Sequence, residues 1–107
     1  NNLGLENYKT IIKKNYKNKI IVFRLGNGEI NVFNKGILEK YKFFLIKKVK
    51  DTTACGDAFN ACFLYNYFNS CKIKDCVKLA HRLGKYVANF KGAIIPKKNF
   101  NPKLYVN

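Results

Sequence analysis

The stretch Asp51-Thr52-Thr53-Ala54-Cys55-Gly56-Asp57-Ala58-Phe59 joins a predicted strand directly to a predicted helix and places a carboxylate at the helix start. Backbone N–H groups at the amino end of a helix have no carbonyl partner within the helix and lie at the positive end of its dipole. Residues as small as Ala54 and Gly56 let phosphate oxygens approach such groups closely. Asp57 can also accept a proton. From the residue types alone, an anion site with an attached base and a plain strand-to-helix turn capped by Asp57 are equally supported.

The segments upstream of this stretch predict strands. Lys19 to Arg24 is a continuous run of β-branched and aromatic residues that is typical of a buried strand. Apolar residues alternate from Glu29 to Asn34, so these two segments are expected to form a hairpin, and Phe43 to Val49 is predicted as a third strand.

The segments downstream predict two helices and a tail. The apolar period changes from two to about 3.6 residues after the quoted stretch, so one helix is predicted to begin near Gly56. A second is predicted from Lys74 to Phe90, and residues 93–107 form a tail. The buried stripe of the second helix is predicted to be Val77, Ala80, Gly84, Val87 and Ala88. The tail is expected to dock on the core through Ile94, Ile95, Phe100 and Leu104.

Length and composition predict one globular unit. The 107 residues are too few for two hydrophobic cores, and 48% of them are hydrophobic, which is well above the range of disordered chains. The sequence contains no Met and begins with Asn1 in polar sequence, so we expect it to be a piece of a longer protein.

The net charge of +15 raises the alternative of a nucleic-acid or polyphosphate binder. Only Arg24 and Arg82 are arginines, and the lysines are scattered through every segment rather than clustered with aromatic residues. Abundant Lys, Asn, Ile, Tyr and Phe, all with codons rich in A and T, also fit a biased genome, so nucleic acid is not the favoured partner.

The four cysteines do not predict a metal site, because no two of them have the C-x-x-C spacing. The sequence contains no signal peptide and no apolar run near twenty residues, so no membrane partner is predicted, and a cytoplasmic protein with reduced thiols is expected.

The quoted stretch resembles the D-T-x-G-A-G-D-x-F signature of the ribokinase (PfkB) family of sugar and nucleoside kinases. The resemblance implies a ribokinase-like α/β fold, a Rossmann-like three-layer α/β/α arrangement of which this chain is the carboxy-terminal portion only. It implies that Asp57 is the catalytic base and that Ala54, Cys55 and Gly56 form the anion hole. Cys55 is a departure, since alanine is usual there, but an anion hole is built from backbone groups.

The resemblance extends over about residues 17 to 98. Ile21 to Gly26 resembles the strand and turn that lie near the nucleotide, although Arg24 replaces the usual Thr, and Gly26 is implied as a nucleotide-binding residue. His81 resembles the side chain that lies against the adenine. As a lone helical histidine, it is equally compatible with a structural role.

Three further residues, Asp51, Thr53 and Gly92, resemble those around a monovalent-cation site, for which K⁺ is the expected ion. Asp51 fixing the loop by hydrogen bonding is the equal alternative.

The resemblance implies ATP-dependent phosphoryl transfer to a hydroxyl of a sugar or nucleoside, with Mg²⁺ on the phosphates. It assigns residues 1–18 to the end of an upstream element and residues 19–107 to the nucleotide-binding and catalytic part. The amino-terminal half of the kinase is the expected missing partner, and a homodimer is also open. The alternative is a non-catalytic kinase remnant that serves as a nucleotide-binding or interaction module.

Overall fold

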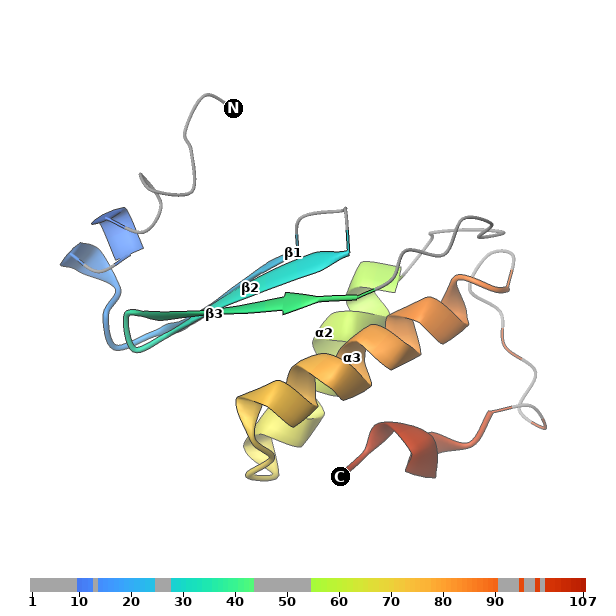
Figure 1. Cartoon of the computed structure of the whole chain (residues 1–107). Helices are drawn as coiled ribbons and strands as arrows, with labels where there is room; N and C mark the ends of the chain where they lie inside the picture. Colours follow the sequence, from blue (N-terminus) through green and yellow to red (C-terminus); the bar gives the residue numbers. More distant parts are fainter. Residues whose placement is uncertain are drawn as a thin grey trace. The chain divides into compact units, whose positions relative to one another are not determined.

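The computed structural model of the chain describes residues 10–12, 14–24, 28–43, 55–90, 95, 98 and 100–107. The chain divides into two compact units, residues 1–45 and residues 46–107. Among the described residues, Figure 1 shows three strands and a short helical segment, at residues 10–12 and 14–15, in the first unit, and two α-helices in the second.

The first unit contains a three-stranded antiparallel meander made of β1 (Ile20–Arg24), β2 (Glu29–Asn34) and β3 (Ile37–Lys42). β2 is the central strand, and four consecutive residues of it, 30–33, are buried, so both of its faces are covered. Lys35 and Gly36 connect β2 to β3 and both have positive φ, 53° and 81°. Positive φ at both loop residues is the geometry of a type I′ turn, which matches the twist of the strands it joins.

This meander confirms the predicted hairpin of residues 19–24 and 29–34, since β1 and β2 pair with Val22 opposite Val32. It also contains a strand that the sequence did not predict, β3. The strand predicted over Phe43 to Val49 lies outside the described residues, except for Phe43, which follows β3. Among the described residues, β1 pairs with β2 alone and therefore forms an edge of the sheet.

The second unit is built on two helices, α2 (Cys55–Phe68) and α3 (Ile73–Val87), which lie side by side and antiparallel (Figure 1). The helix predicted to begin near Gly56 is thus confirmed. The predicted stripe of the second helix is also confirmed, because all five of its residues are buried. The predicted end of that helix at Phe90 is wrong: α3 ends at Val87, and residues 88–90 continue as a turn in which the Asn89 and Phe90 N–H groups bond to carbonyls three residues earlier.

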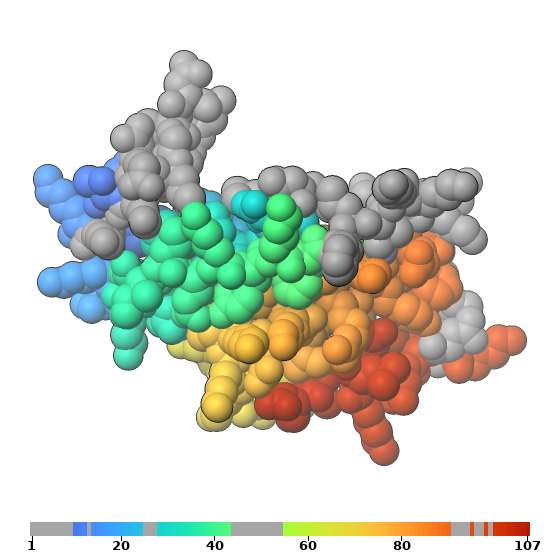
Figure 2. Space-filling view, viewed as in Figure 1, coloured from blue at the N-terminus to red at the C-terminus, as the bar shows by residue number. Residues whose placement is uncertain are grey.

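The carboxy-terminal segment packs on the two helices through a 3₁₀ turn, η3 (Pro102–Tyr105). Figure 2 shows this segment, in red, beside α3, in orange. Asn101 caps the turn by accepting a hydrogen bond from the Lys103 N–H at 3.1 Å. Tyr105 is the docked residue, with 7% of its surface exposed, and its ring stacks on Phe100 at 5.7 Å.

The predicted docking of the tail through Leu104 is therefore wrong, because this side chain is 55% exposed. Adjacent side chains of a turn point in different directions, and the contact with Phe100 selects Tyr105 instead. Ile95 and Phe100 are half-buried as expected, while Ile94 lies outside the described residues.

Candidate functional site

The amino end of α2 is the candidate site. α2 begins at Cys55, so Gly56 and Asp57 belong to its first turn, where backbone N–H groups point out of the helix and have no acceptor within it. These N–H groups and the helix dipole favour an anion at this end. Cys55 and Gly56 are half-buried, and Asp57 is exposed.

Asp57 is the one charged residue of α2, since no basic residue follows in the remaining turns. Its carboxylate lies at the position of the first turn at which an acidic side chain also complements the helix dipole. An exposed carboxylate beside outward-pointing N–H groups can accept a proton from a molecule bound at the same helix end. The geometry is therefore compatible both with a catalytic base and with simple stabilisation of the helix.

Helix α3 approaches the amino end of α2 closely at Gly84. A Cβ atom added to Gly84 would lie 3.3 Å from the carbonyl oxygen of Cys55 and 4.0 Å from the Cβ of Phe59. Contacts this short between a side chain and backbone are tighter than usual packing allows, so the absent side chain permits the approach. His81 lies one turn before Gly84 on α3 and is half-buried. His81 therefore lies on α3, the helix that borders the start of α2.

The other predicted site residues lie outside the described residues. These are Ala54 of the anion hole, Gly26 of the nucleotide turn, and the cation-site residues Asp51, Thr53 and Gly92. Their roles stay predictions, and so does the assignment of Asp57 as the base.

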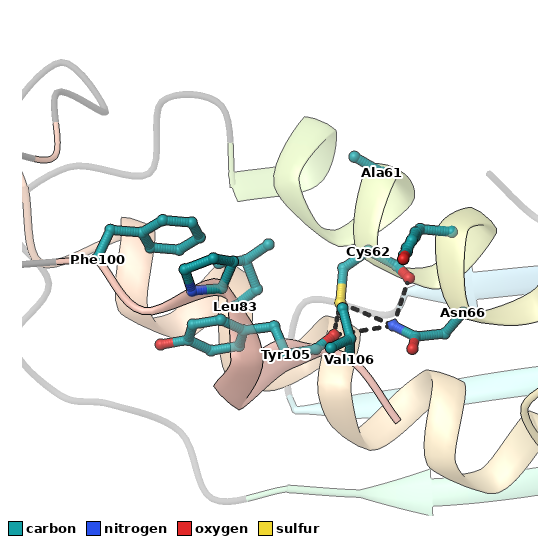
Figure 3. Close-up of a pocket in the computed structure, with 9 residues that line it drawn as sticks. Ala61, Cys62, Asn66, Leu83, Phe100, Tyr105 and Val106 are labelled. Atoms are coloured by element: carbon teal, nitrogen blue, oxygen red, sulfur yellow. Dashed lines mark hydrogen bonds between the residues drawn. The ribbon is translucent and has the colours of Figure 1, made fainter. Parts of the chain in front are cut away.

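A second cluster, not predicted from the sequence, occupies the opposite half of α2 (Figure 3). The Asn66 side chain is buried and donates hydrogen bonds to the Cys62 and Tyr105 carbonyl oxygens, each at 2.9 Å. Its carboxamide oxygen accepts a bond from the Asn107 N–H at 3.0 Å. The sequence signal for this cluster was an asparagine among the apolar residues of a predicted helix, because a buried amide requires hydrogen-bond partners.

The thiol of Cys62 joins this cluster by donating to the Tyr105 carbonyl at 3.3 Å. Burial raises the pKa of the Cys62 thiol, although the hydrogen bond from Asn66 acts in the opposite direction. The group is therefore held as a neutral structural thiol.

A cavity of about 210 Å³ borders this cluster (Figure 3). The residues that line it come from α2, α3 and the carboxy-terminal segment: Ala61, Cys62, Tyr65, Asn66, Leu83, Phe100, Pro102, Tyr105 and Val106. Its lining contains no charged side chain, so it does not suit a phosphate. The anion-binding end of α2 and this cavity are therefore separate features.

The described residues contain no cluster of three or more His, Cys, Asp or Glu side chains that could hold a metal ion. Within the same residues, no helix combines the length and the apolar character needed to cross a bilayer.

Solved structures of kinases share the fold of this chain. Adenosine kinase from Schistosoma mansoni, in complex with 2-fluoroadenosine, matches 75% of this chain and 24% of its own length with a TM-score of 0.68 and 17% identity. Ribokinase from Thermotoga maritima matches 88% of this chain and 38% of its own length with a TM-score of 0.63 and 18% identity. The chain therefore has an α/β, ribokinase-like fold.

Sequence comparison defines the family more narrowly. The sequence profile of the pfkB family carbohydrate kinases matches residues 3–99, which is most of the chain, so the chain belongs to this family. It is 38% identical over 82 residues to a 2-dehydro-3-deoxygluconokinase of Haemophilus influenzae and 30% identical over 90 residues to an adenosine kinase of Dictyostelium discoideum. These matches cover 74% and 82% of this chain but 26% of each relative, so the chain spans about a quarter of their length.

Proposed function

We propose that this chain is the carboxy-terminal, catalytic part of a kinase that transfers the γ-phosphoryl group of ATP to a hydroxyl of a sugar or nucleoside. The observation that carries the proposal is the exposed carboxylate of Asp57 in the first turn of α2, at the end of the helix that favours anions.

In the proposed reaction, Asp57 accepts the proton of the substrate hydroxyl, whose oxygen then attacks the γ-phosphorus as the bond to the β-phosphate oxygen breaks. The backbone of Ala54, Cys55 and Gly56 stabilises the negative charge on the transferring group. Mg²⁺ supplies neutralisation of the phosphate charge when it is bound. His81 and Gly26 would contact the nucleotide, and Asp51, Thr53 and Gly92 would supply hard oxygen ligands to a K⁺ ion.

The outer face of α2 indicates that a further part of the kinase packs on this helix. Asp57, Ala61, Leu64 and Phe68 follow one another at intervals of four, three and four residues, so they lie on one face of the helix. This face is exposed, with Leu64 at 49% and Phe68 at 76%. Apart from Asp57 it carries no charge, in a chain whose net charge is +15. A large apolar stripe of this kind is typical of a surface that another element covers.

We propose that the amino-terminal part of the kinase, which we expect within the three quarters of the relatives that this chain does not match, covers this stripe. The stripe begins at Asp57, so an element that packs on it lies where it can bring a substrate hydroxyl to that carboxylate. A second copy of the chain is a less suitable occupant, because two molecules of charge +15 repel each other.

The stripe is tested by Leu64→Lys in the assembled kinase, which should weaken association of the amino-terminal part, with Ile37→Lys as the matched control at another exposed apolar residue. Equal behaviour of the two variants, or a dimer of the isolated chain that Leu64→Lys dissociates in sedimentation equilibrium, would contradict this choice of partner.

The function is tested by incubating the kinase that contains this chain with γ-labelled ATP, Mg²⁺ and a panel of acceptors that includes a pentose, a sugar acid and a nucleoside. Transfer of label to one of these acceptors is expected. Nucleotide binding without transfer to any acceptor would instead favour the non-catalytic remnant.

A further inference from the structure

Two cysteines occupy paired positions at the amino end of α3. Lys72 precedes the helix with extended backbone, φ −62° and ψ 146°, and its side chain makes no capping bond. Cys71 comes immediately before Lys72, and Cys76 is the fourth residue of the helix. Side chains at these two positions pack on each other in the hydrophobic staple, which fixes the direction in which a chain enters a helix. In α3 both members of the staple are thiols.

Hydrogen bonds hold the two residues in this arrangement. The Cys76 thiol donates to the Cys71 carbonyl at 3.5 Å, and the Cys76 N–H donates to the Lys72 carbonyl at 2.9 Å. The Cys71 N–H donates to the Asn66 carbonyl at 3.0 Å, so the backbone of Cys71 is tied to the end of α2. Burial, followed by a hydrogen bond with the Cys71 side chain, raises the pKa of Cys76 to about 12.

The two thiols differ in their access to solvent. Cys71 is half-buried, whereas none of the surface of Cys76 is exposed. A dissolved oxidant therefore reaches Cys71 first and Cys76 only through Cys71. Cys62 is the other thiol that interacts with both, so it is the competing partner.

We propose that Cys71 and Cys76 form a site of reversible thiol oxidation, at which a disulfide such as glutathione disulfide converts the staple into a covalent bond. The Cys71 thiolate attacks one sulfur of glutathione disulfide, forms a mixed disulfide and releases one glutathione thiolate. The Cys76 sulfur then attacks the Cys71 sulfur, and the second glutathione leaves Cys71 as a thiolate that takes up the proton of the Cys76 thiol. Two protein thiols are oxidised and one glutathione disulfide is reduced to two glutathione molecules.

This site is independent of the proposed kinase reaction. The bond would close a loop of six residues, from Cys71 to Cys76, and fix the entry of the chain into α3. No residue of the proposed phosphoryl-transfer site takes part, so the test needs no catalytic readout.

The test is oxidation of the full chain by glutathione disulfide, followed by trypsin and mass spectrometry without reduction. Trypsin cuts after Lys72 and Lys74, so it separates Cys76 from Cys71, and fragmentation of the linked peptides identifies the partner of Cys76. The Cys71–Cys76 bond is expected to exceed any other pairing by about tenfold or more, because the Cys76 thiol is held at the backbone of Cys71 before reaction. Cys71→Ser should abolish oxidation of Cys76, and the matched control Cys55→Ser should leave the yield of this disulfide unchanged.

The proposal is overturned by a main product that joins Cys62 to either thiol, by a glutathione adduct on Cys71 that does not proceed further, or by the absence of reaction. Neighbouring cysteines in an unfolded chain also pair readily, so the oxidation is repeated in concentrated guanidinium chloride. The excess of the Cys71–Cys76 bond should fall there to the roughly twofold or less that its shorter loop alone gives. An equal excess in both conditions would show that the folded geometry does not create the site.

Discussion

Replacement of Asn66 by Ala should detach the carboxy-terminal segment from the helices. The Asn66 amide is 2% exposed and makes two hydrogen bonds to this segment, one to the Tyr105 carbonyl at 2.9 Å and one from the Asn107 N–H at 3.0 Å. Each such bond contributes roughly 0.5–1.5 kcal/mol to the free energy of unfolding. The Tyr105 carbonyl keeps a weaker donor, the Cys62 thiol at 3.3 Å, so it does not become fully unsatisfied. We therefore expect a loss of about 2 kcal/mol.

The matched control is Asn69→Ala. Asn69 also donates from its amide to a carbonyl four residues earlier, that of Tyr65 at 2.7 Å, but this bond is exposed. Its removal should change the free energy of unfolding by less than about 0.5 kcal/mol. Urea denaturation followed by circular dichroism gives both values, and hydrogen exchange of the Asn107 amide should accelerate in Asn66→Ala alone. Equal destabilisation by the two variants, or unchanged exchange at Asn107, would refute the role of Asn66.

Two further perturbations test the packing of α3 and the sheet. Gly84→Ala places a methyl group 3.3 Å from the Cys55 carbonyl oxygen, so it should shift the NMR resonance of the Gly56 amide. The gain in helix propensity, about 1 kcal/mol, offsets the strain in the free energy of unfolding. The control Lys85→Ala, at an exposed residue, should leave the Gly56 resonance in place. Unmoved Gly56 resonances in Gly84→Ala would contradict the close approach. Burial and the hydrogen bond to Glu39 raise the pKa of Tyr41 from 10.0 to about 12, so the stability that Tyr41 contributes is present below pH 10 and is lost as the pH rises towards 12. Urea denaturation between pH 10 and 12 should show this loss of unfolding free energy in the wild-type protein but not in Tyr41→Phe. An identical pH dependence of the two proteins would rule out the contribution of Tyr41.

The helices could be predicted from the sequence because their signals are local. The predicted stripe residues of α3, Val77, Ala80, Gly84 and Val87, recur at the helical period, and all four are buried. The change of the apolar period after the small residues that surround Asp57 predicted where α2 begins. Local signals of this kind need no knowledge of distant contacts.

The missed features depend on contacts between distant segments. β3 (Ile37–Lys42) carries three charged residues, and its strand structure comes from pairing with β2 rather than from a strong pattern of its own. Tyr105 rather than Leu104 docks because its ring packs on Phe100 and on Tyr86 of α3, the latter 19 residues away in sequence. The sequence alone does not show which distant residues contact each other.

The candidate site was predictable in part for the same reason. Asp57 and Gly56 lie in the first turn of α2 as the loop sequence predicted. The close approach of Gly84 to Cys55 joins two helices and was visible in the sequence only as a small residue on the α3 stripe.

The most direct measurement of the central claim compares Asp57→Asn with Asp75→Asn in the kinase that contains this chain. Both aspartates lie in the first turn of a helix, Asp57 in α2 and Asp75 in α3, so the two variants remove the same charge from equivalent positions. Loss of a general base reduces turnover by roughly 10²–10⁴-fold, and this loss is expected for Asp57→Asn with nucleotide affinity nearly unchanged. Asp75→Asn should retain turnover. If Asp57→Asn turns over at the rate of Asp75→Asn, Asp57 is not the base and only complements the dipole of its helix.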